Sequence, residues 1–255
     1  MPQTWPPLAG LKFRFPKVLG KIVYLQPLSL SDYPGKLSAI VFFAGCNLRC
    51  PFCYNSELVL PELMAGLRPL APEAILSGLA ERFGFLDGVV LTGGEPTLSP
   101  DLPEFVRALK NLGFLVKLDT NGTNPAVLTK LLQEKLLDYV ALDIKAPFPR
   151  YSGYTGLREA EEAVKAVQES LSVILRLAPD YEVRTTVAPG LSAPDLLDIA
   201  QSLKGVKRYV LQPFLVPKEK RLVNEEWRTH PALGPTELKD LLLELRKFVP
   251  VELRA

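Results

Sequence analysis

Cysteine and histidine are both scarce in this sequence. Its 255 residues include three cysteines and a single histidine, His230. Three cysteines are too few, and odd in number, for a disulfide framework, which excludes the small secreted domains that such bridges hold together. Cys46, Cys50 and Cys53 all fall on one short stretch of the chain. Clustered cysteines of this kind indicate a metal site in a reducing compartment.

Long apolar runs and a strong charge imbalance are absent as well. The longest apolar run, residues 37–44, is far shorter than the roughly 20 residues of a membrane-spanning helix. A formal net charge of +2 gives no reason to expect a nucleic-acid or membrane partner. Residues 1–15 carry prolines and aromatics where a signal peptide has a smooth apolar core. We therefore expect a soluble, cytoplasmic protein.

Apolar segments rich in β-branched residues alternate with helical patterns along most of the chain. Strands are predicted at residues 37–43, 88–91, 114–118, 139–144, 181–187 and 206–212, with a weaker candidate at 21–28. Helices are predicted at residues 72–83, 101–112, 125–133, 158–177, 194–203 and 235–248. Strands that alternate with helices imply right-handed crossovers and a parallel sheet. We predict an α/β fold, an open partial (β/α)6 barrel.

The ends of the chain lack this alternation. We expect residues 1–36 to form an N-terminal extension, residues 37–214 the barrel, and residues 215–255 a C-terminal loop and helix packed on it. In barrels of this kind the chemistry lies where strands end and the following loops begin. Candidate residues are therefore sought at the carboxyl ends of the predicted strands.

The cysteines follow the first predicted barrel strand directly, in the sequence GCNLRCPFC at residues 45–53. Three thiolates on one loop can bind three irons of a [4Fe–4S] cubane and leave the fourth iron open to a substrate. The alternative of a structural zinc site needs four protein ligands as a rule, but there is no fourth cysteine and His230 is distant in sequence. A third alternative, buried and inert cysteines, is disfavoured because Asn47 and Arg49 indicate a loop.

The spacing Cys-x3-Cys-x2-Cys, with the aromatic Phe52 before the last cysteine, resembles the signature of the radical S-adenosylmethionine (SAM) superfamily. A Gly-Gly-Glu-Pro sequence at residues 93–96 strengthens the resemblance, which implies the partial barrel of that superfamily. It also implies that Cys46, Cys50 and Cys53 hold a [4Fe–4S] cluster whose open iron binds SAM. Reduction of the cluster would then cleave SAM to methionine and a 5′-deoxyadenosyl radical.

The second barrel strand ends in Gly93, Gly94 and Glu95. Glycines let the backbone approach a ligand closely, and Glu95 offers an acceptor for an ammonium group. The resemblance implies that this stretch holds the methionyl amino group of SAM. The alternative is an ordinary glycine-rich turn with a glutamate at the start of a helix.

Acidic residues end the next two strands, Asp119 and Asp143. Their shared position predicts that both lie at the mouth of the barrel. The resemblance implies that they surround the methionyl carboxylate together with Thr120, with Asn121 among the cofactor-binding residues. Lys145 would face the ligand or the substrate as a catalytic candidate. Two carboxylates would repel a ligand carboxylate, so a bound monovalent cation is a further expectation; the alternative is a plain turn and solvated strand ends.

Three more side chains are singled out. Arg184 is a charged residue in a strand that otherwise looks buried, so it either pairs with a neighbouring carboxylate or binds the methionyl carboxylate. Phe52 and Tyr54 flank Cys53, and we expect them to cover the cluster and the adenine or to pack the loop. Many activases carry His where this chain has Tyr54, which puts in doubt a role for a basic side chain there.

Four segments narrow the resemblance, at residues 29–36, 117–122, 142–147 and 184–187. They resemble the activating protein of the anaerobic ribonucleoside-triphosphate reductase, a glycyl-radical-enzyme activase. The resemblance implies that the adenosyl radical takes a hydrogen from one glycine of that reductase. A flavodoxin or a ferredoxin-type protein would donate the electron.

Two alternatives remain open. A small barrel of this superfamily can act on a small molecule, as the 7-carboxy-7-deazaguanine synthases do. The chain can also be a non-catalytic iron–sulfur module for electron transfer. That last alternative leaves residues 93–95, Asp119 and Asp143 unexplained.

Overall fold

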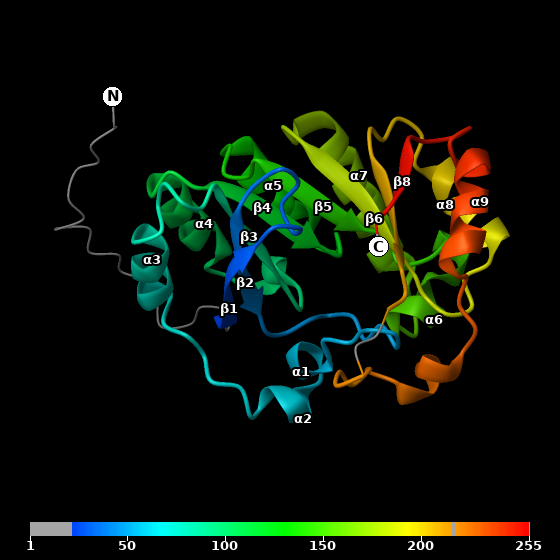
Figure 1. Cartoon of the computed structure of the whole chain (residues 1–255), viewed down its shortest axis with the longest axis horizontal. Coiled ribbons are helices and arrows are strands. Elements are labelled where there is room, and N and C mark those ends of the chain that lie inside the picture. Colours follow the sequence, from blue (N-terminus) through cyan, green and yellow to red (C-terminus); the bar gives the residue numbers. More distant parts are fainter. Residues whose placement is uncertain (1–21, 216–217, 255) are drawn as a thin grey trace.

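A sheet of eight strands organises the computed structural model, which describes residues 22–215 and 218–254 (Figure 1). The strands lie side by side in sequence order, from β1 at one end to β8 at the other. β1 (Ile22–Ser29) pairs antiparallel with β2 (Ser38–Phe43), and each later neighbour is parallel. The later strands are β3 (Gly88–Gly93), β4 (Leu115–Thr120), β5 (Tyr139–Asp143), β6 (Tyr181–Val187), β7 (Tyr209–Pro213) and β8 (Val251–Leu253).

Helices connect the parallel strands. The longer ones are α3 (Pro72–Ala80), α4 (Leu102–Asn111), α5 (Pro125–Gln133), α7 (Glu161–Leu177), α8 (Ala193–Ser202) and α9 (Pro235–Leu245). The short ones are α1 (Ser56–Val59), α2 (Pro61–Met64), α6 (Tyr151–Thr155), η1 (Pro96–Leu98), η2 (Phe148–Arg150) and η3 (Glu225–Thr229). Five of the longer helices carry a proline in the first turn, where a missing N–H costs nothing. None of the helices in the described part of the chain has both the length and the apolar character of a membrane span.

The predicted open α/β barrel is confirmed. β2 to β7 correspond to the six predicted barrel strands, and β1 corresponds to the weaker candidate. The structure adds β8, which pairs with β7 through Val251, Glu252 and Leu253. β1 and β8 come from the two predicted extensions, so the sheet continues across both expected boundaries; the division itself stays a prediction. The sheet does not close into a complete barrel: β1 and β8 are its two edge strands and do not pair with each other.

The two faces of the sheet differ in chemistry. Successive side chains of a strand point to opposite faces, so each strand contributes to both. One face is apolar and packs against the helices, with Leu91, Leu118 and Leu142 fully buried. On the inner face, Lys117 of β4 and Arg184 of β6 take part in ion pairs. The interior of this partial barrel is therefore charged where a closed eight-stranded barrel is filled by branched apolar residues.

The turn between β1 and β2 covers the end of the sheet at which the parallel strands begin. Tyr33 in this turn is 5% exposed, and its ring centre lies 5.7 Å from that of Tyr139 at the start of β5. A Cβ atom added to Gly88 at the start of β3 would lie 3.1 Å from the Tyr33 ring and 2.7 Å from the Leu115 carbonyl oxygen. The absence of a side chain at Gly88 therefore provides the space that the Tyr33 ring occupies.

Gly88→Ala should lower the free energy of unfolding by about 1–3 kcal/mol, the usual cost of forcing extra volume into a packed site. Gly78→Ala is the matched control, because Gly78 lies inside α3 and nothing stands within 4 Å of its added Cβ. That control should raise stability by about 0.5–1 kcal/mol. Urea unfolding of both variants measures the difference, and a stable Gly88→Ala protein would contradict the packing of Tyr33 on this glycine.

Candidate active site

The cysteine loop follows β2 and is fixed by hydrogen bonds to two short helices. The Gly45 N–H donates to the Leu58 carbonyl in α1 at 2.8 Å, and the Arg49 N–H donates to the Thr155 carbonyl in α6 at 2.8 Å. The Arg49 guanidinium donates to the Cys46 carbonyl at 2.6 Å. Hydrogen bonds to α1 and α6, together with bonds within the loop, thus fix the backbone of the cysteine loop.

All three cysteines are free thiols on this loop, with Cys50 buried and the other two partly buried. Burial raises the pKa of each thiol, that of Cys50 to about 12. The Lys145 ammonium opposes this rise at all three, because a nearby cation favours the thiolate. Thiolates are the metal-binding form, so Lys145 promotes ligation at this loop.

The donor set fits an iron–sulfur cubane. Within residues 22–215 and 218–254, no three His, Cys, Asp or Glu side chains converge on a position for a single metal ion. In a cubane, each of three thiolates binds a different iron, so the thiolates do not need to converge. Three cysteines on one loop therefore suit a [4Fe–4S] cluster better than the four-ligand zinc site considered as an alternative.

Gly93 and Gly94 allow the end of β3 to lie directly against the cysteine loop. Gly93 has φ +118°, in the region that favours glycine, and a Cβ on Gly94 would lie 2.1 Å from the Gly45 carbonyl oxygen. The Gly94 N–H donates to the Phe43 carbonyl at 2.7 Å, and the Glu95 N–H donates to the Gly45 carbonyl at 2.8 Å. Any side chain at Gly94 would push these two loops apart.

The Glu95 carboxylate joins the ends of β3 and β4. Glu95 is 2% exposed, and its Oε1 accepts hydrogen bonds from the Thr97 hydroxyl at 2.6 Å and the Thr120 hydroxyl at 2.7 Å. Its Oε2 accepts from the Asn121 N–H at 2.7 Å. Burial raises the pKa of Glu95, and these hydrogen bonds offset part of the rise. The structure thus gives Glu95 a bracing role, while its contact with the methionyl amino group stays a prediction.

Asn121 connects the end of β4 to the cysteine loop. Its Nδ2 donates to the Asn47 Oδ1 at 3.0 Å and lies 3.8 Å from the Cys46 Sγ. The Asn47 amide in turn donates to the Thr123 hydroxyl at 2.8 Å. The predicted site residues at the ends of β2, β3 and β4 therefore meet in one place.

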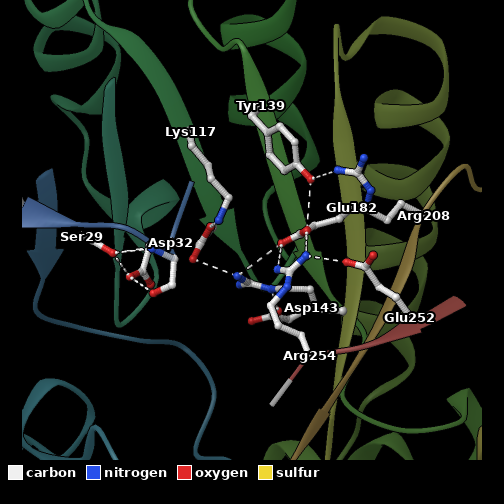
Figure 2. Close-up of polar contacts among 12 residues, drawn as sticks. Ser29, Asp32, Lys117, Tyr139, Asp143, Glu182, Arg208, Glu252 and Arg254 are labelled. Carbon is white, nitrogen blue, oxygen red and sulfur yellow. Dashed lines mark hydrogen bonds and ion pairs between the residues drawn. The ribbon is translucent and has the colours of Figure 1, made fainter. Parts of the chain in front are cut away.

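Arg184 lies between the two acidic residues that end β4 and β5. Its Nε is 2.8 Å from the Asp143 Oδ1, and its Nη1 is 3.0 Å from the Asp119 Oδ2. Lys145 binds the other oxygen of Asp143 at 3.0 Å, and Lys117 binds the other oxygen of Asp119 at 2.7 Å. Of the two interpretations of Arg184, pairing with neighbouring carboxylates is confirmed; binding of the methionyl carboxylate stays a prediction. Figure 2 shows Lys117 and Asp143 within this network.

The ion pairs decide the protonation of these groups. Burial alone would raise the pKa of Asp119 and of Asp143, but Arg184 together with Lys117 at Asp119 and Lys145 at Asp143 outweighs burial and holds both below their usual range. Burial likewise would lower the pKa of Lys145, and Asp143 outweighs it and raises that pKa. Asp119, Asp143, Lys145 and Arg184 are therefore all charged at neutral pH.

Sequence reasoning missed a second set of charges deeper in the sheet (Figure 2). Glu182 of β6 is fully buried, and Arg254 beside β8 binds its two oxygens at 3.0 and 2.8 Å. The Tyr139 hydroxyl also donates to Glu182, at 3.1 Å. Lys117 was missed too, although it is 1% exposed. Lys117 and Glu182 each interrupt an apolar strand two residues before a predicted site residue, and that signal could have found them.

The aromatic residues of the cysteine loop have different surroundings. Phe52 is 5% exposed, and its ring lies 6.0 Å from Trp227 and 6.3 Å from Tyr154. Tyr54 is 43% exposed. The expectation that both rings cover the cluster and the adenine stays a prediction.

Comparison with known proteins places the chain in a family. The sequence model of the radical SAM superfamily matches residues 40–203, which is more than half of the chain. The chain belongs to the radical SAM superfamily. This confirms the resemblance seen in the cysteine spacing. Membership implies a [4Fe–4S] cluster and SAM, and the residues that would hold the cluster are Cys46, Cys50 and Cys53.

Two relatives within the radical SAM superfamily carry activase names. A Methanocaldococcus jannaschii protein, provisionally named a glycyl-radical enzyme activating enzyme, is 36% identical over 225 residues, covering 87% of this chain and 90% of that protein. The pyruvate formate-lyase-activating enzyme of Clostridium pasteurianum is 28% identical over 208 residues, covering 77% and 83%. A radical SAM methyltransferase from Sphaerobacter thermophilus has a similar fold, with a TM-score of 0.66 at 16% identity over 89% of this chain and 68% of that chain.

In a radical SAM protein the bound cluster and SAM supply a low-potential electron and a cleavable sulfonium C–S bond. The residues of this chain do the rest. The loop anchors at Gly45 and Arg49 fix the positions of the thiols. Lys145 places positive charge near the three thiols, and Arg184 holds the two acids at the strand ends, with no proton to gain or lose on either cation at neutral pH. Phe52 keeps water from one side of the loop because it is buried against Trp227.

Proposed function

We propose that this protein cleaves SAM reductively and uses the 5′-deoxyadenosyl radical to generate a glycyl radical on a partner enzyme, the anaerobic ribonucleoside-triphosphate reductase. The observation that carries the proposal is the meeting of the cysteine loop with the strand ends that hold the Asp119–Arg184–Asp143 cluster, since Asn121, two residues after Asp119, lies 3.8 Å from the Cys46 Sγ. The activase names of the two relatives, which align over most of their length, support the glycyl-radical step. The protein would act in the cytoplasm.

The arrangement suits an amino-acid ligand at the open iron. A methionyl carboxylate would be attracted by Arg184 and Lys145, which already share Asp143 at 2.8 and 3.0 Å. The amino group would lie toward the carbonyls of Gly93 and Gly94 and toward Glu95. A monovalent cation beside Asp119 and Asp143 stays a prediction; in this structure Arg184, Lys117 and Lys145 already pair with the two carboxylates.

A protein substrate is compatible with this sheet. The adenosyl radical must reach a carbon atom of the partner directly, so a segment of the partner has to approach the site. The sheet ends at β1 and β8 without closing, which supports access from the side. A small-molecule substrate, as in the 7-carboxy-7-deazaguanine synthases, is the second candidate, and a non-catalytic module is the third.

Electron paramagnetic resonance tests the proposal. An anaerobic mixture would contain the cluster-loaded protein, dithionite, SAM and the reductase of the same organism. We expect a glycyl-radical doublet that depends on the protein, on SAM and on the reductant. The glycine-to-alanine variant of the reductase at its radical position is the control, and it should give no doublet.

Two other outcomes of this experiment would contradict parts of the proposal. Formation of 5′-deoxyadenosine without a doublet would keep SAM cleavage but contradict the reductase as partner, and small molecules would be screened next. Absence of 5′-deoxyadenosine from a protein with a full cluster would contradict catalysis and favour the electron-transfer module.

A further inference from the structure

The short helix α6 packs directly on the cysteine loop. A Cβ atom added to Gly156, the residue that caps the end of α6, would lie 2.4 Å from the Arg49 carbonyl oxygen. On the other side of Cys50, the centre of the Phe52 ring lies 6.3 Å from that of Tyr154. The helix thus contacts the chain both before and after Cys50, which is itself buried. Side chains of α6 are therefore placed to act on the Cys50 thiol.

Tyr151, the first residue of α6, has a buried hydroxyl group that forms no hydrogen bond. Its side chain is fully buried, and its Oη has no hydrogen-bond partner among the residues that the structure describes. Tyr139, Tyr154, Tyr181 and Tyr209 are also buried, and the hydroxyl of each takes part in a hydrogen bond. An unpaired buried hydroxyl costs free energy that a phenylalanine at the same position would avoid. A tyrosine at this position therefore indicates a role for the hydroxyl group.

Electrostatic interactions place this hydroxyl near Cys50 and Lys145. Burial raises the pKa of Tyr151; Lys145 opposes the rise, and Cys50 and Asp143 add to it. The backbone N–H of Lys145 contributes without reaching hydrogen-bond geometry, and as a donor it cannot accept the hydroxyl proton. The Lys145 ammonium is also a donor only, and both Asp143 oxygens are already bound, by Lys145 and by Arg184. The sulfur of Cys50 is therefore the acceptor that suits the Tyr151 proton.

We propose that Tyr151 is a positioning residue whose hydroxyl donates a hydrogen bond to the Cys50 sulfur in the cluster-loaded protein and makes the cluster easier to reduce. Reduction adds negative charge to a cluster and its sulfur ligands, so a donor beside one sulfur stabilises the reduced form more than the oxidised form. The electron comes from an external reductant, and no covalent bond is made or broken. The proposal rests on the cluster that membership of the superfamily implies, and not on the identity of the substrate.

Tyr151→Phe tests the role of the hydroxyl, because it keeps the ring, whose centre lies 5.9 Å from that of Phe148. A redox titration with dithionite and mediators, on the full-length, cluster-loaded protein without SAM, measures the midpoint potential of the cluster. We expect a more negative potential in the variant, so that at a fixed potential the ratio of reduced to oxidised cluster falls at least about three-fold. Tyr209→Phe is the matched control, since its hydroxyl is equally buried but bonds to the Thr185 hydroxyl at 2.9 Å. Its potential should equal that of the wild type.

Urea unfolding of the cluster-free proteins is a second readout, in which the two variants should differ in the opposite sense. Tyr151→Phe removes a hydroxyl that has no partner in the protein, so stability should stay the same or rise. Tyr209→Phe breaks a buried hydrogen bond, so stability should fall. A loss of stability in cluster-free Tyr151→Phe would overturn the proposal, because the hydroxyl would then have a partner in the protein itself.

The potentials decide the remaining outcomes. An unchanged potential in Tyr151→Phe would overturn the proposal, and so would an equal shift in Tyr209→Phe, because the effect would then come from packing in general. The potential is measured on the clusters that form, so incomplete iron loading does not alter the result. A wild-type protein that binds no cluster would overturn the proposal together with the assignment of the cysteines. Neither readout involves SAM or the reductase, so failure of the proposed glycyl-radical step leaves the result unaffected.

Discussion

Cys50→Ala should abolish the reductive cleavage of SAM that we propose for this protein. Cys50 is the most deeply buried of the three thiols, and the family implies that it binds one iron of the cluster. Changes to groups that merely support a metal ligand cost roughly 10–100-fold in affinity or activity, so loss of the ligand itself should cost at least about 100-fold. Without a third thiolate the cubane would lose its third anchored iron.

Iron content, cluster absorbance and 5′-deoxyadenosine formation with dithionite measure this loss. His230→Ala is the control, because His230 is the single histidine and the one imidazole that a zinc site could have used. The control should keep its iron and its cleavage activity. A Cys50→Ala protein that still forms 5′-deoxyadenosine at the wild-type rate would contradict the cluster assignment.

Arg184→Met should lower the free energy of unfolding by about 3–5 kcal/mol at neutral pH, as expected when one partner of a buried ion pair is removed. Arg184 is 12% exposed, and its loss leaves Asp119 and Asp143 facing each other with one lysine each. Iron content should stay intact, whereas SAM binding should weaken because the site loses its central cation.

The pH dependence of this variant follows from the two carboxyl groups. In the wild type, Arg184 holds the pKa of Asp119 and of Asp143 below the value of about 3.9 that Asp has in an unfolded chain. A lowered folded-state pKa gives stability that is present above the unfolded pKa and is lost as pH falls through the folded one. The gap between wild type and Arg184→Met should therefore be widest at neutral pH and narrow below about pH 4.

Urea unfolding at pH 7, 5 and 3 would measure this gap. Arg176→Met on the exposed side of α7 is the matched control and should change stability by less than about 0.5 kcal/mol. Equal stability of the two variants at pH 7 would show that Arg184 does not hold the cluster together.

The barrel strands were predictable because each is largely buried on both faces: β2, β3 and β5 read as apolar runs, and charged residues interrupt the apolar pattern of β4 and β6 on the inner face. β8 has only three residues, which are too few to show a periodic pattern. Its pairing with β7 depends on how the folded chain returns to the sheet and not on local sequence. Nothing in the sequence indicates that the ring of Tyr33 packs beside Gly88 under the sheet. The local sequence pattern thus predicts the repeating strand–helix unit but not the segments that cover the ends of the sheet.

The site was predictable to the extent that it follows strand ends. Asp119 and Asp143 end neighbouring strands, and Arg184 stands out as a charge in an apolar segment. That Arg184 bridges both acids depends on register, which places Asp143 opposite Arg184 across β5 and β6. Contact between Phe52 and Trp227 depends on the path of a loop between distant parts of the chain, and no spacing rule reports it.

The charged interior of the sheet also bears on how this fold responds to heat. Ion pairs connect β4, β5, β6 and Arg254, the residue after β8, on the inner face. Hydration of ions becomes less favourable as temperature rises, so the cost of keeping these charges away from water falls on warming. The contribution of apolar burial per unit area levels off over the same range. The ion pairs therefore contribute a larger share of the stability of this sheet, relative to apolar burial, as the protein approaches its melting temperature.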